Sequence, residues 1–159
     1  MKVFYYYGAL AAVVAIAGFV HAQSAKNQVA SHDSAREKLI GAWRLVSLEG
    51  PGADRKISRI TDLKGMLVYT RDGHMSVQLM YPKSASGLSN DYVKNGYEAS
   101  FGSYDVDEEA HTVTHRVEGS ITQGLVRKDL PRIYQFSEGR LIIKATRPAE
   151  HWSVTWEHY

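Results

Sequence analysis

The chain has 159 residues, of which 44% are hydrophobic, and its 19 Lys and Arg against 17 Asp and Glu give a net charge of +2. This length suits one domain with a single core and is too short for two. The near balance of charge, without a run of basic residues, argues against nucleic-acid and anionic-membrane partners. The absence of cysteine excludes disulfides, thiolate metal sites and an acylated lipoprotein anchor.

The first 22 residues have the pattern of a secretory signal peptide. Lys2 supplies a positive charge, residues 3–20 carry no charge, and Val20-His21-Ala22 predicts cleavage after Ala22. An uncleaved anchor is the alternative, because the uncharged run could nearly span a bilayer. The tyrosines and glycines within the run, and the polar residues that follow it, favour cleavage.

We therefore expect an exported protein, periplasmic or secreted, with no stable membrane insertion after cleavage. A polar leader without apolar periodicity follows over residues 23–36, and the folded domain is expected over residues 37–159. Ser34 and Glu37 stand in capping-box order, which predicts a short helix that ends near Gly41.

Beyond that helix the apolar period changes to two. Residues 42–48 are a predicted first strand, with Trp43, Leu45 and Ser47 on one face. Residues 49–55 contain two glycines and a proline and are a predicted loop.

Asp72-Gly73 lies between two apolar-rich runs and predicts a β-hairpin over residues 65–80 with a two-residue turn. This register places on one face the pairs Thr70 with Met75, Val68 with Val77 and Met66 with Leu79, and on the other face Tyr69, Ser76 and Gln78.

Residues 81–95 form a long predicted connection with room for a short helix from Asp91 towards Glu98, and such a connection is often a binding loop. Two further hairpins and a final strand follow. Their predicted strands are residues 99–106 with 112–120, 132–137 with 140–146, and 152–159. About eight short strands without a βαβ rhythm indicate an all-β fold, a single antiparallel barrel or sandwich.

His115 is the candidate for chemistry, because its strand places it on the same face as two valines. If Val106 pairs with Val113, Tyr104 lies opposite His115, and the two side chains are candidate catalytic or ligand-binding groups. The alternative is a hydrogen-bonded core histidine, and a one-residue slip in register would separate the pair.

Arg132, Tyr134 and Phe136 share a face two strands further on. If this face is inward, Arg132 brings a cation to the cavity that suits a carboxylate, enolate or phosphate; if it is outward, Arg132 is solvated. Trp152 and Trp156 are expected to close one end or wall of the barrel, although packing alone also explains both. No metal or cofactor site is expected, because the seven histidines are scattered and His111 falls in a turn.

Four stretches together resemble the bacterial and fungal lipocalin-like domain family. They are LIGAWRLVS at 39–47, KGMLVYTRDGHMSVQLM at 64–80, FGSYDVD at 101–107 with VTHRVEGS at 113–120, and Trp156-Glu157. The resemblance covers residues 39–157 and implies a calycin-type β-barrel. Gly41 and Trp43 match its Gly-x-Trp strand, in which the glycine permits close approach and the tryptophan plugs one end. The resemblance carries over no catalytic residue.

Three functions remain open at this stage. The first is an exported carrier of one small, largely apolar ligand, with Tyr104, His115, Arg132, Tyr134 and Trp156 as ligand contacts. The second is a cofactor-independent isomerase, cyclase or lyase with His115 as base and Tyr104 as proton donor. The third is a filled barrel whose exposed face or 81–95 connection binds a protein. The sequence leaves the oligomeric state open.

Overall fold

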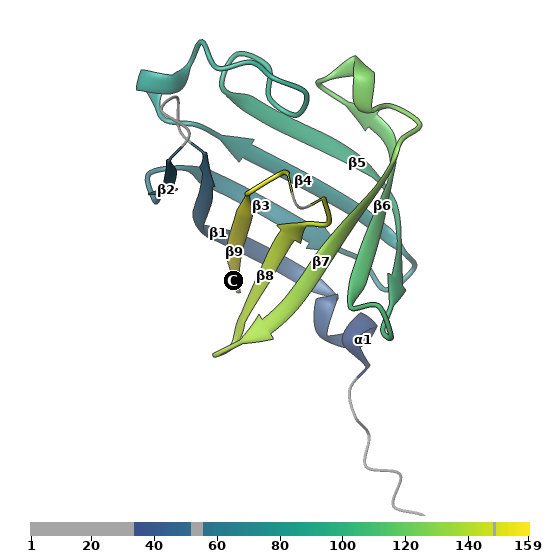
Figure 1. Ribbon diagram of the computed structural model, residues 1–159. Helices are drawn as coiled ribbons and strands as arrows, with labels where there is room; N and C mark the ends of the chain where they lie inside the picture. The colour runs from purple at the N-terminus through teal and green to yellow at the C-terminus, as the bar shows by residue number, and fades with distance from the viewer. Residues whose placement is uncertain (1–33, 52–55, 148) are drawn as a thin grey trace, which may run out of the picture. The chain divides into compact units, whose positions relative to one another are not determined.

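One antiparallel sheet contains all nine described strands, in the order β2-β1-β3-β4-β5-β6-β7-β8-β9. An additional pairing of β1 with β9 closes eight of them into a barrel, as Figure 1 shows. The strands are β1 Gly41–Pro51, β2 Ile57–Ile60, β3 Lys64–Tyr69, β4 His74–Met80, β5 Tyr97–Asp107, β6 Thr112–Ser120, β7 Asp129–Ser137, β8 Arg140–Ala145 and β9 Ser153–His158. The all-β antiparallel barrel expected from the sequence is confirmed.

The computed structural model describes residues 34–51, 56–147 and 149–159. The predicted signal peptide and most of the predicted leader lie outside these residues. The described residues belong to one unit, Ser31–Tyr159. None of their helices is both long and apolar enough to cross a membrane.

Helix α1, Ala35–Leu39, precedes the barrel and begins as the sequence predicts. The Ser34 hydroxyl accepts a hydrogen bond from the backbone N–H of Glu37 at 3.2 Å, which satisfies one of the free donors of the first turn. Leu39 is buried, and its carbonyl accepts a hydrogen bond from Trp43 Nε1 at 2.8 Å. This bond ties the helix to the first strand at one end of the barrel.

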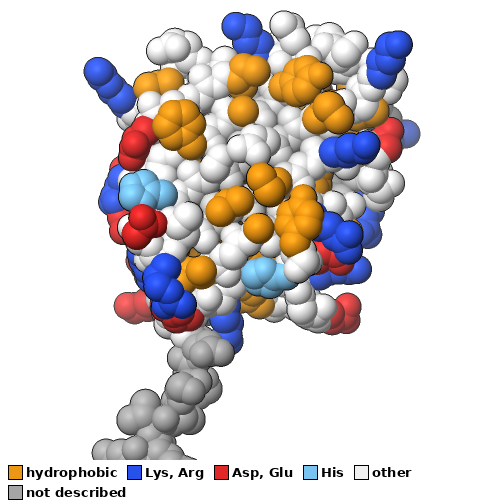
Figure 2. Space-filling model, turned by 180° about the vertical axis from the view of Figure 1, so that it is seen from behind, with side chains coloured by type: hydrophobic (Ala, Val, Ile, Leu, Met, Phe, Trp, Pro, Cys, Tyr) orange, Lys and Arg blue, Asp and Glu red, His pale blue; other side chains and the backbone are white. Residues whose placement is uncertain are grey.

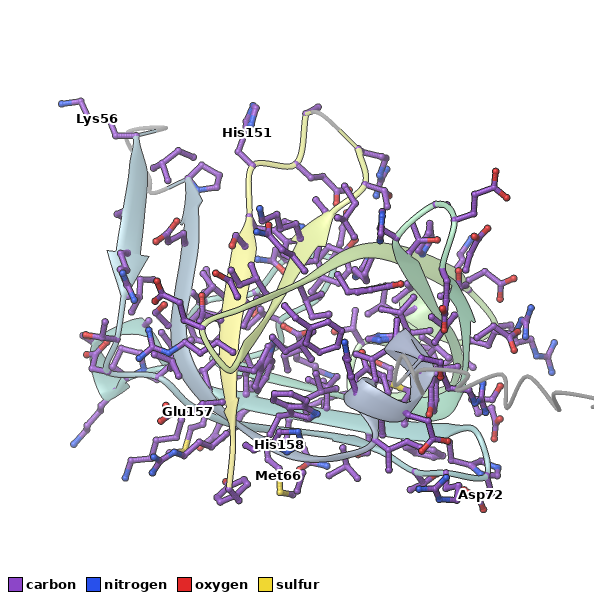
Figure 3. The ribbon with its side chains drawn as sticks, turned by 90° about the horizontal axis from the view of Figure 1, so that it is seen from below. Lys56, Met66, Asp72, His151, Glu157 and His158 are labelled. Carbon is purple, nitrogen blue, oxygen red and sulfur yellow. The ribbon has the colours of Figure 1, made fainter. Side chains whose placement is uncertain are left out.

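Gly41 lies where β1 passes close to the last residue of β9. Its φ is +135°, and an added Cβ would lie 2.7 Å from Cε1 of His158. The imidazole of His158 also stacks on Trp43 with ring centroids 3.5 Å apart; His158 is labelled in Figure 3, which views the barrel from below. The close approach implied by the Gly-x-Trp resemblance is therefore present.

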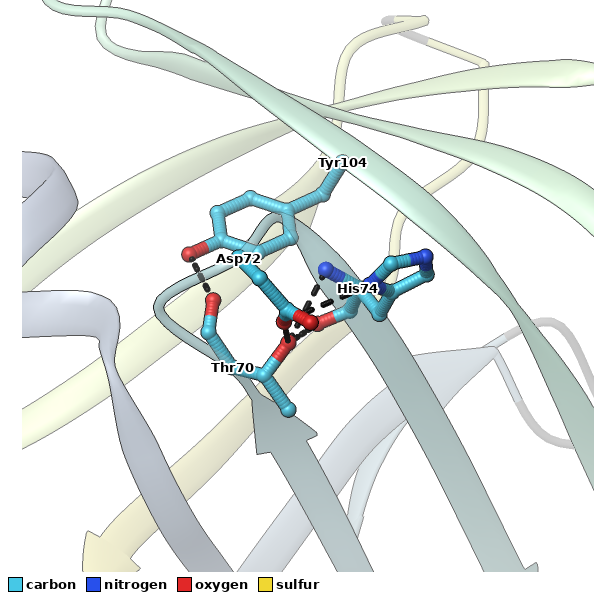
Figure 4. A network of polar contacts seen from close by, with 4 residues as sticks. All are labelled: Thr70, Asp72, His74 and Tyr104. Carbon is cyan, nitrogen blue, oxygen red and sulfur yellow. Dashed lines mark hydrogen bonds and ion pairs between the residues drawn. The ribbon is translucent and has the colours of Figure 1, made fainter.

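The hairpin of β3 and β4 has a different register from the predicted one. Tyr69 pairs with Met75 and Leu67 with Val77, so each β3 partner is shifted by one residue and β3 presents its other face to the interior. The predicted two-residue turn is wrong because Thr70 leaves the ladder. Its hydroxyl accepts from the N–H of His74 at 3.0 Å and also bonds Asp72, as Figure 4 shows. Tyr69 is consequently inside the barrel.

Two other predictions fail between the strands. The predicted loop at 49–55 is wrong at its start, since β1 continues to Pro51, and residues 52–55 lie outside the described residues. The short strand β2 was not foreseen. The helix predicted from Asp91 towards Glu98 is absent, because Asn90 Oδ1 accepts the N–H groups of Tyr92 and Val93 and forms a turn there. The connection instead contains the 3₁₀ helix η1, Lys83–Ala85, and a second one, η2 Gln123–Leu125, follows β6.

The two later hairpins have the predicted pairing. Val106 pairs with Val113 and Tyr104 with His115 in β5–β6, while Phe136 pairs with Leu141 in β7–β8. Alternate residues therefore face the interior along these strands. On the outside, Met66, Met80, Tyr97 and Phe101 of β3, β4 and β5 are exposed. Figure 2 shows apolar side chains spread across the face opposite to the one in Figure 1.

Candidate functional site

The interior of the barrel contains a cavity of about 340 Å³ that is partly open to solvent. Its apolar wall comes from inward residues of six strands, including Leu67, Val77, Leu79, Ile143, Val154 and Trp156. Its rim comes from β2, from the connection after β4 and from the segment before β9, including Ile60, Tyr81, Leu88, Tyr92 and Trp152. The volume lies at the lower end of the range of small-molecule sites, roughly 300–1,000 Å³.

His115 lines this cavity and is 8% exposed. Its Nε2 lies 2.7 Å from the hydroxyl of Tyr69, with which it shares a hydrogen bond. Burial, with a smaller contribution from the Arg132 cation, lowers the pKa of His115 to about 3. Burial also raises the pKa of Tyr69 well above its ordinary value. Both groups are therefore neutral at physiological pH, and among the described residues Nδ1 of His115 has no hydrogen-bond partner.

Tyr104 lies opposite His115 in the ladder, but its ring is not part of the cavity wall. Its hydroxyl donates to the carbonyl of Thr70 at 2.9 Å, and its ring packs 4.8 Å from that of Tyr69 and under the guanidinium of Arg36. The structure therefore brings His115 to Tyr69 rather than to Tyr104. The sequence missed Tyr69 because the predicted hairpin register turned it outward.

Arg132 points into the barrel, the inward alternative of the sequence reading, and is 8% exposed. Its guanidinium lies 4.9 Å from the ring centroid of Trp152 and 5.4 Å from that of Tyr92. Nη1 donates to the carbonyl of Pro131 at 3.1 Å. Within the described residues no carboxylate oxygen lies within 4.0 Å of it, so the cation and its other N–H donors remain available at the cavity wall.

Glu98 is a second residue of the site that sequence reasoning overlooked. It pairs with Leu79 in the β4–β5 ladder and lines the cavity beside Ser100. Burial raises its pKa to about 7, and the Arg132 cation opposes this shift only in part. The predicted helix towards Glu98 hid its position. Extending the two-residue period of Tyr104 back along the strand would have placed Glu98 on the inner face.

The two remaining candidates differ in position. Trp156 lines the cavity, and its Nε1 is buried without a hydrogen-bond partner among the described residues. Tyr134 is buried against Phe136, with ring centroids 5.8 Å apart, and is not part of the cavity wall. Three of the five predicted ligand contacts, His115, Arg132 and Trp156, thus surround one cavity.

This arrangement combines an apolar chamber with a few convergent polar groups: one cation, one carboxyl that titrates near neutrality and one neutral imidazole. Such a combination is typical of sites that orient a small amphipathic molecule. In the part of the chain that the structure describes, no group of three His, Asp or Glu side chains is placed to hold a metal ion.

Two solved structures and one family model are similar to this chain. A lipocalin-like protein from Bacteroides uniformis has a similar structure, with a TM-score of 0.46 and 12% identity over 77% of this chain and 99% of that one. An uncharacterized protein from Bacteroides eggerthii gives a TM-score of 0.45 and 13% identity over 76% and 99%. No curated protein matches significantly. The family model of the lipocalin-like domain matches residues 40–158. The chain therefore belongs to the lipocalin-like domain family.

Proposed function

We propose that this protein binds one small, largely apolar molecule inside its barrel. The observation that carries this proposal is the cavity of about 340 Å³, which has an apolar wall and polar groups at Glu98, His115 and Arg132. A barrel filled by its own side chains, the rival expectation, has no need of an interior arginine that lacks a salt-bridge partner among the described residues. Burying a cation without a nearby carboxylate lowers the stability of the free protein, and a bound anion would offset this loss.

The proposed binding takes place outside the cytoplasm. Residues 1–22 support this part of the proposal through their charge-free run and the small residues before the predicted cleavage point. N-terminal sequencing of the protein recovered from an exporting cell is expected to begin at Gln23. A retained Met1 would contradict export by cleavage and leave the binding proposal intact.

An enzymatic role has less support in the residues that first suggested it. The low pKa of His115, about 3, makes its imidazole a weak base. Burial raises the pKa of Tyr104, which makes its hydroxyl a weak acid. Glu98 is the one observation that favours catalysis, because general acids and bases work best with a pKa near the ambient pH. Native mass spectrometry of a co-purified molecule before and after incubation distinguishes a carrier from an enzyme.

Titration with N-phenyl-1-naphthylamine, an apolar fluorophore with one N–H group, tests the proposal. We expect saturable binding of one probe per wild-type chain. His115→Gln keeps a hydrogen-bonding group for Tyr69, so the variant is expected to fold and to lose ~1–3 kcal/mol of affinity, the scale of one buried polar contact. His111→Gln, in the exposed β5–β6 turn, is the matched control and keeps wild-type affinity. A wild-type protein that binds no probe contradicts the proposal.

A further inference from the structure

We infer that Arg132 and Glu98 form the subsite for a carboxylate head group, and that a carboxylate ligand binds together with one proton. This inference rests on the proposed function and specifies its ligand: an apolar chain or ring that carries one carboxylate. Both side chains line the same cavity and come from β7 and β5, the two strands that flank β6.

Arg132 supplies the positive half of the subsite. The rings of Trp152 and Tyr92 hold its guanidinium in place, and one N–H is used by the carbonyl of Pro131. Guanidinium groups match carboxylates through pairs of parallel N–H donors. Because no carboxylate lies within salt-bridge distance among the described residues, a ligand carboxylate is the partner that the buried cation lacks.

Glu98 decides which anion fits. When ionised, it repels a second carboxylate; when protonated, it donates its O–H to one oxygen of the ligand carboxylate while Arg132 binds the other. Two carboxyl groups that share a site hold one proton between them. The proton comes from solvent, and no covalent bond to carbon changes. A phosphate monoester, with its second negative charge, would face one cation and a nearby acid and fits less well.

Two other titratable groups that line the cavity, His115 and Tyr81, keep one protonation state around neutral pH. His115, on β6, has a pKa of about 3 and is neutral. Tyr81, after β4, faces Glu98 and has its pKa raised to about 12, mainly by burial. Tyr92 packs against Arg132, whose guanidinium lies 5.4 Å from the centroid of its ring. Glu98, whose pKa burial raises to about 7, changes charge between pH 6 and pH 8.

Isothermal titration of the purified protein with octanoate and with 1-octanol tests the subsite. Both probes present the same apolar chain, and only one carries a carboxylate. We expect octanoate to bind about tenfold more tightly at pH 6 than at pH 8, because a group with a pKa near 7 must gain a proton. Titrations at pH 8 in two buffers of different ionisation enthalpy should show uptake of about one proton per octanoate. The affinity for octanol should not change with pH.

Two variants assign the effect to residues. Glu98→Gln donates an N–H at every pH, so octanoate should bind without pH dependence or proton uptake. Glu118→Gln, on the exposed face of β6, is its matched control and should behave as wild type. Arg132→Gln should lose at least about tenfold in octanoate affinity and keep octanol binding, since it removes a charge-assisted contact. Arg140→Gln, on the exposed start of β8, is its control.

The outcomes separate this inference from the proposed function. If octanol binds while octanoate binds no better and takes up no proton, the carboxylate subsite is wrong and the apolar site stands. If neither probe binds, both are wrong. Should a variant fail to fold, the proton count measured on the wild-type protein still decides the inference.

Discussion

The two ends of the barrel differ in how their interior is filled, although the same strands form both (Figure 1). At the end covered by α1, large side chains fill the interior and their polar atoms are paired: Trp43 donates to Leu39 and Tyr104 to Thr70. At the other end, under the 81–96 connection, the interior is hollow, and Arg132 has no carboxylate partner among the described residues. The filled end supplies stability, and the hollow end is therefore free to keep polar groups that a ligand can use.

Replacing an aromatic residue at the filled end should have the largest effect on stability. Trp43 is 2% exposed and packs on Phe136 and His158. Trp43→Ala is expected to lower the free energy of unfolding by ~3–5 kcal/mol, the usual loss for a buried large aromatic. Urea denaturation measures it, with Tyr159→Ala at a 74% exposed position as the control. Equal urea midpoints for the two variants would contradict the assignment of Trp43 to the core.

Adding one methyl group at Gly41 tests the close approach of β1 and β9. The positive φ and the contact with His158 both oppose a Cβ, so Gly41→Ala should cost ~1–3 kcal/mol. Gly124→Ala is the control, because nothing lies within 4 Å of its added Cβ. Thermal melts of the two variants, followed by probe titration, should show a loss of stability at Gly41 with ligand affinity unchanged. A Gly41→Ala protein as stable as Gly124→Ala would show that the strands have room to separate.

The buried titratable groups at the hollow end should make the stability of the protein depend on pH, with smaller effects than the two substitutions above. Glu98 titrates near 7 when folded and near 4.5 when unfolded, so its contribution to stability grows as the pH falls through this window. His115 titrates near 3 when folded and near 6.5 when unfolded, so stability is lost as the pH falls below 6.5. The two slopes oppose each other between pH 6.5 and 4.5.

Single substitutions separate the contributions of Glu98 and His115 to the pH dependence of stability. Relative to wild type, Glu98→Gln should lose stability and His115→Gln should gain it as the pH falls from 6.5 to 5, each by at most ~1.4 kcal/mol per pH unit. Urea denaturation at several pH values measures both. Parallel curves for the two variants would place both side chains in solvent.

The strands and the later hairpins could be predicted because their periods and turns are local. At two sites the structure could not be predicted from neighbouring residues alone. The Asp72-Gly73 pair predicted a two-residue turn, but the hydroxyl of Thr70 bonds the N–H of His74 and the turn is longer. Tyr69 therefore pairs with Met75 and faces the interior. Glu98 lies near the start of β5, next to the connection where a short helix was predicted, and it is held in the strand by pairing with Leu79 of β4.

The cavity itself could not be predicted from spacing. Its polar end depends on contacts between distant segments, such as Trp152 with Arg132 and the pair of Tyr69 and His115. The sequence placed His115 on the inner face and made Trp156 a candidate ligand contact. It contained no signal for whether side chains or empty space lay between them. Side-chain volumes and strand tilt together decide that, and neither is a local property.

The central claim is that the interior of the barrel is open to a ligand. A substitution that fills the cavity with a larger side chain tests this claim most directly. Ser100 lies on the cavity wall with little exposed surface, so Ser100→Phe should occupy the space, leave the melting temperature near or above that of wild type and abolish binding of N-phenyl-1-naphthylamine. Ser76→Phe, on the outer face of β4, should bind the probe as wild type does. A folded Ser100→Phe protein that binds the probe with wild-type affinity would show that the probe binds elsewhere, and would contradict the account.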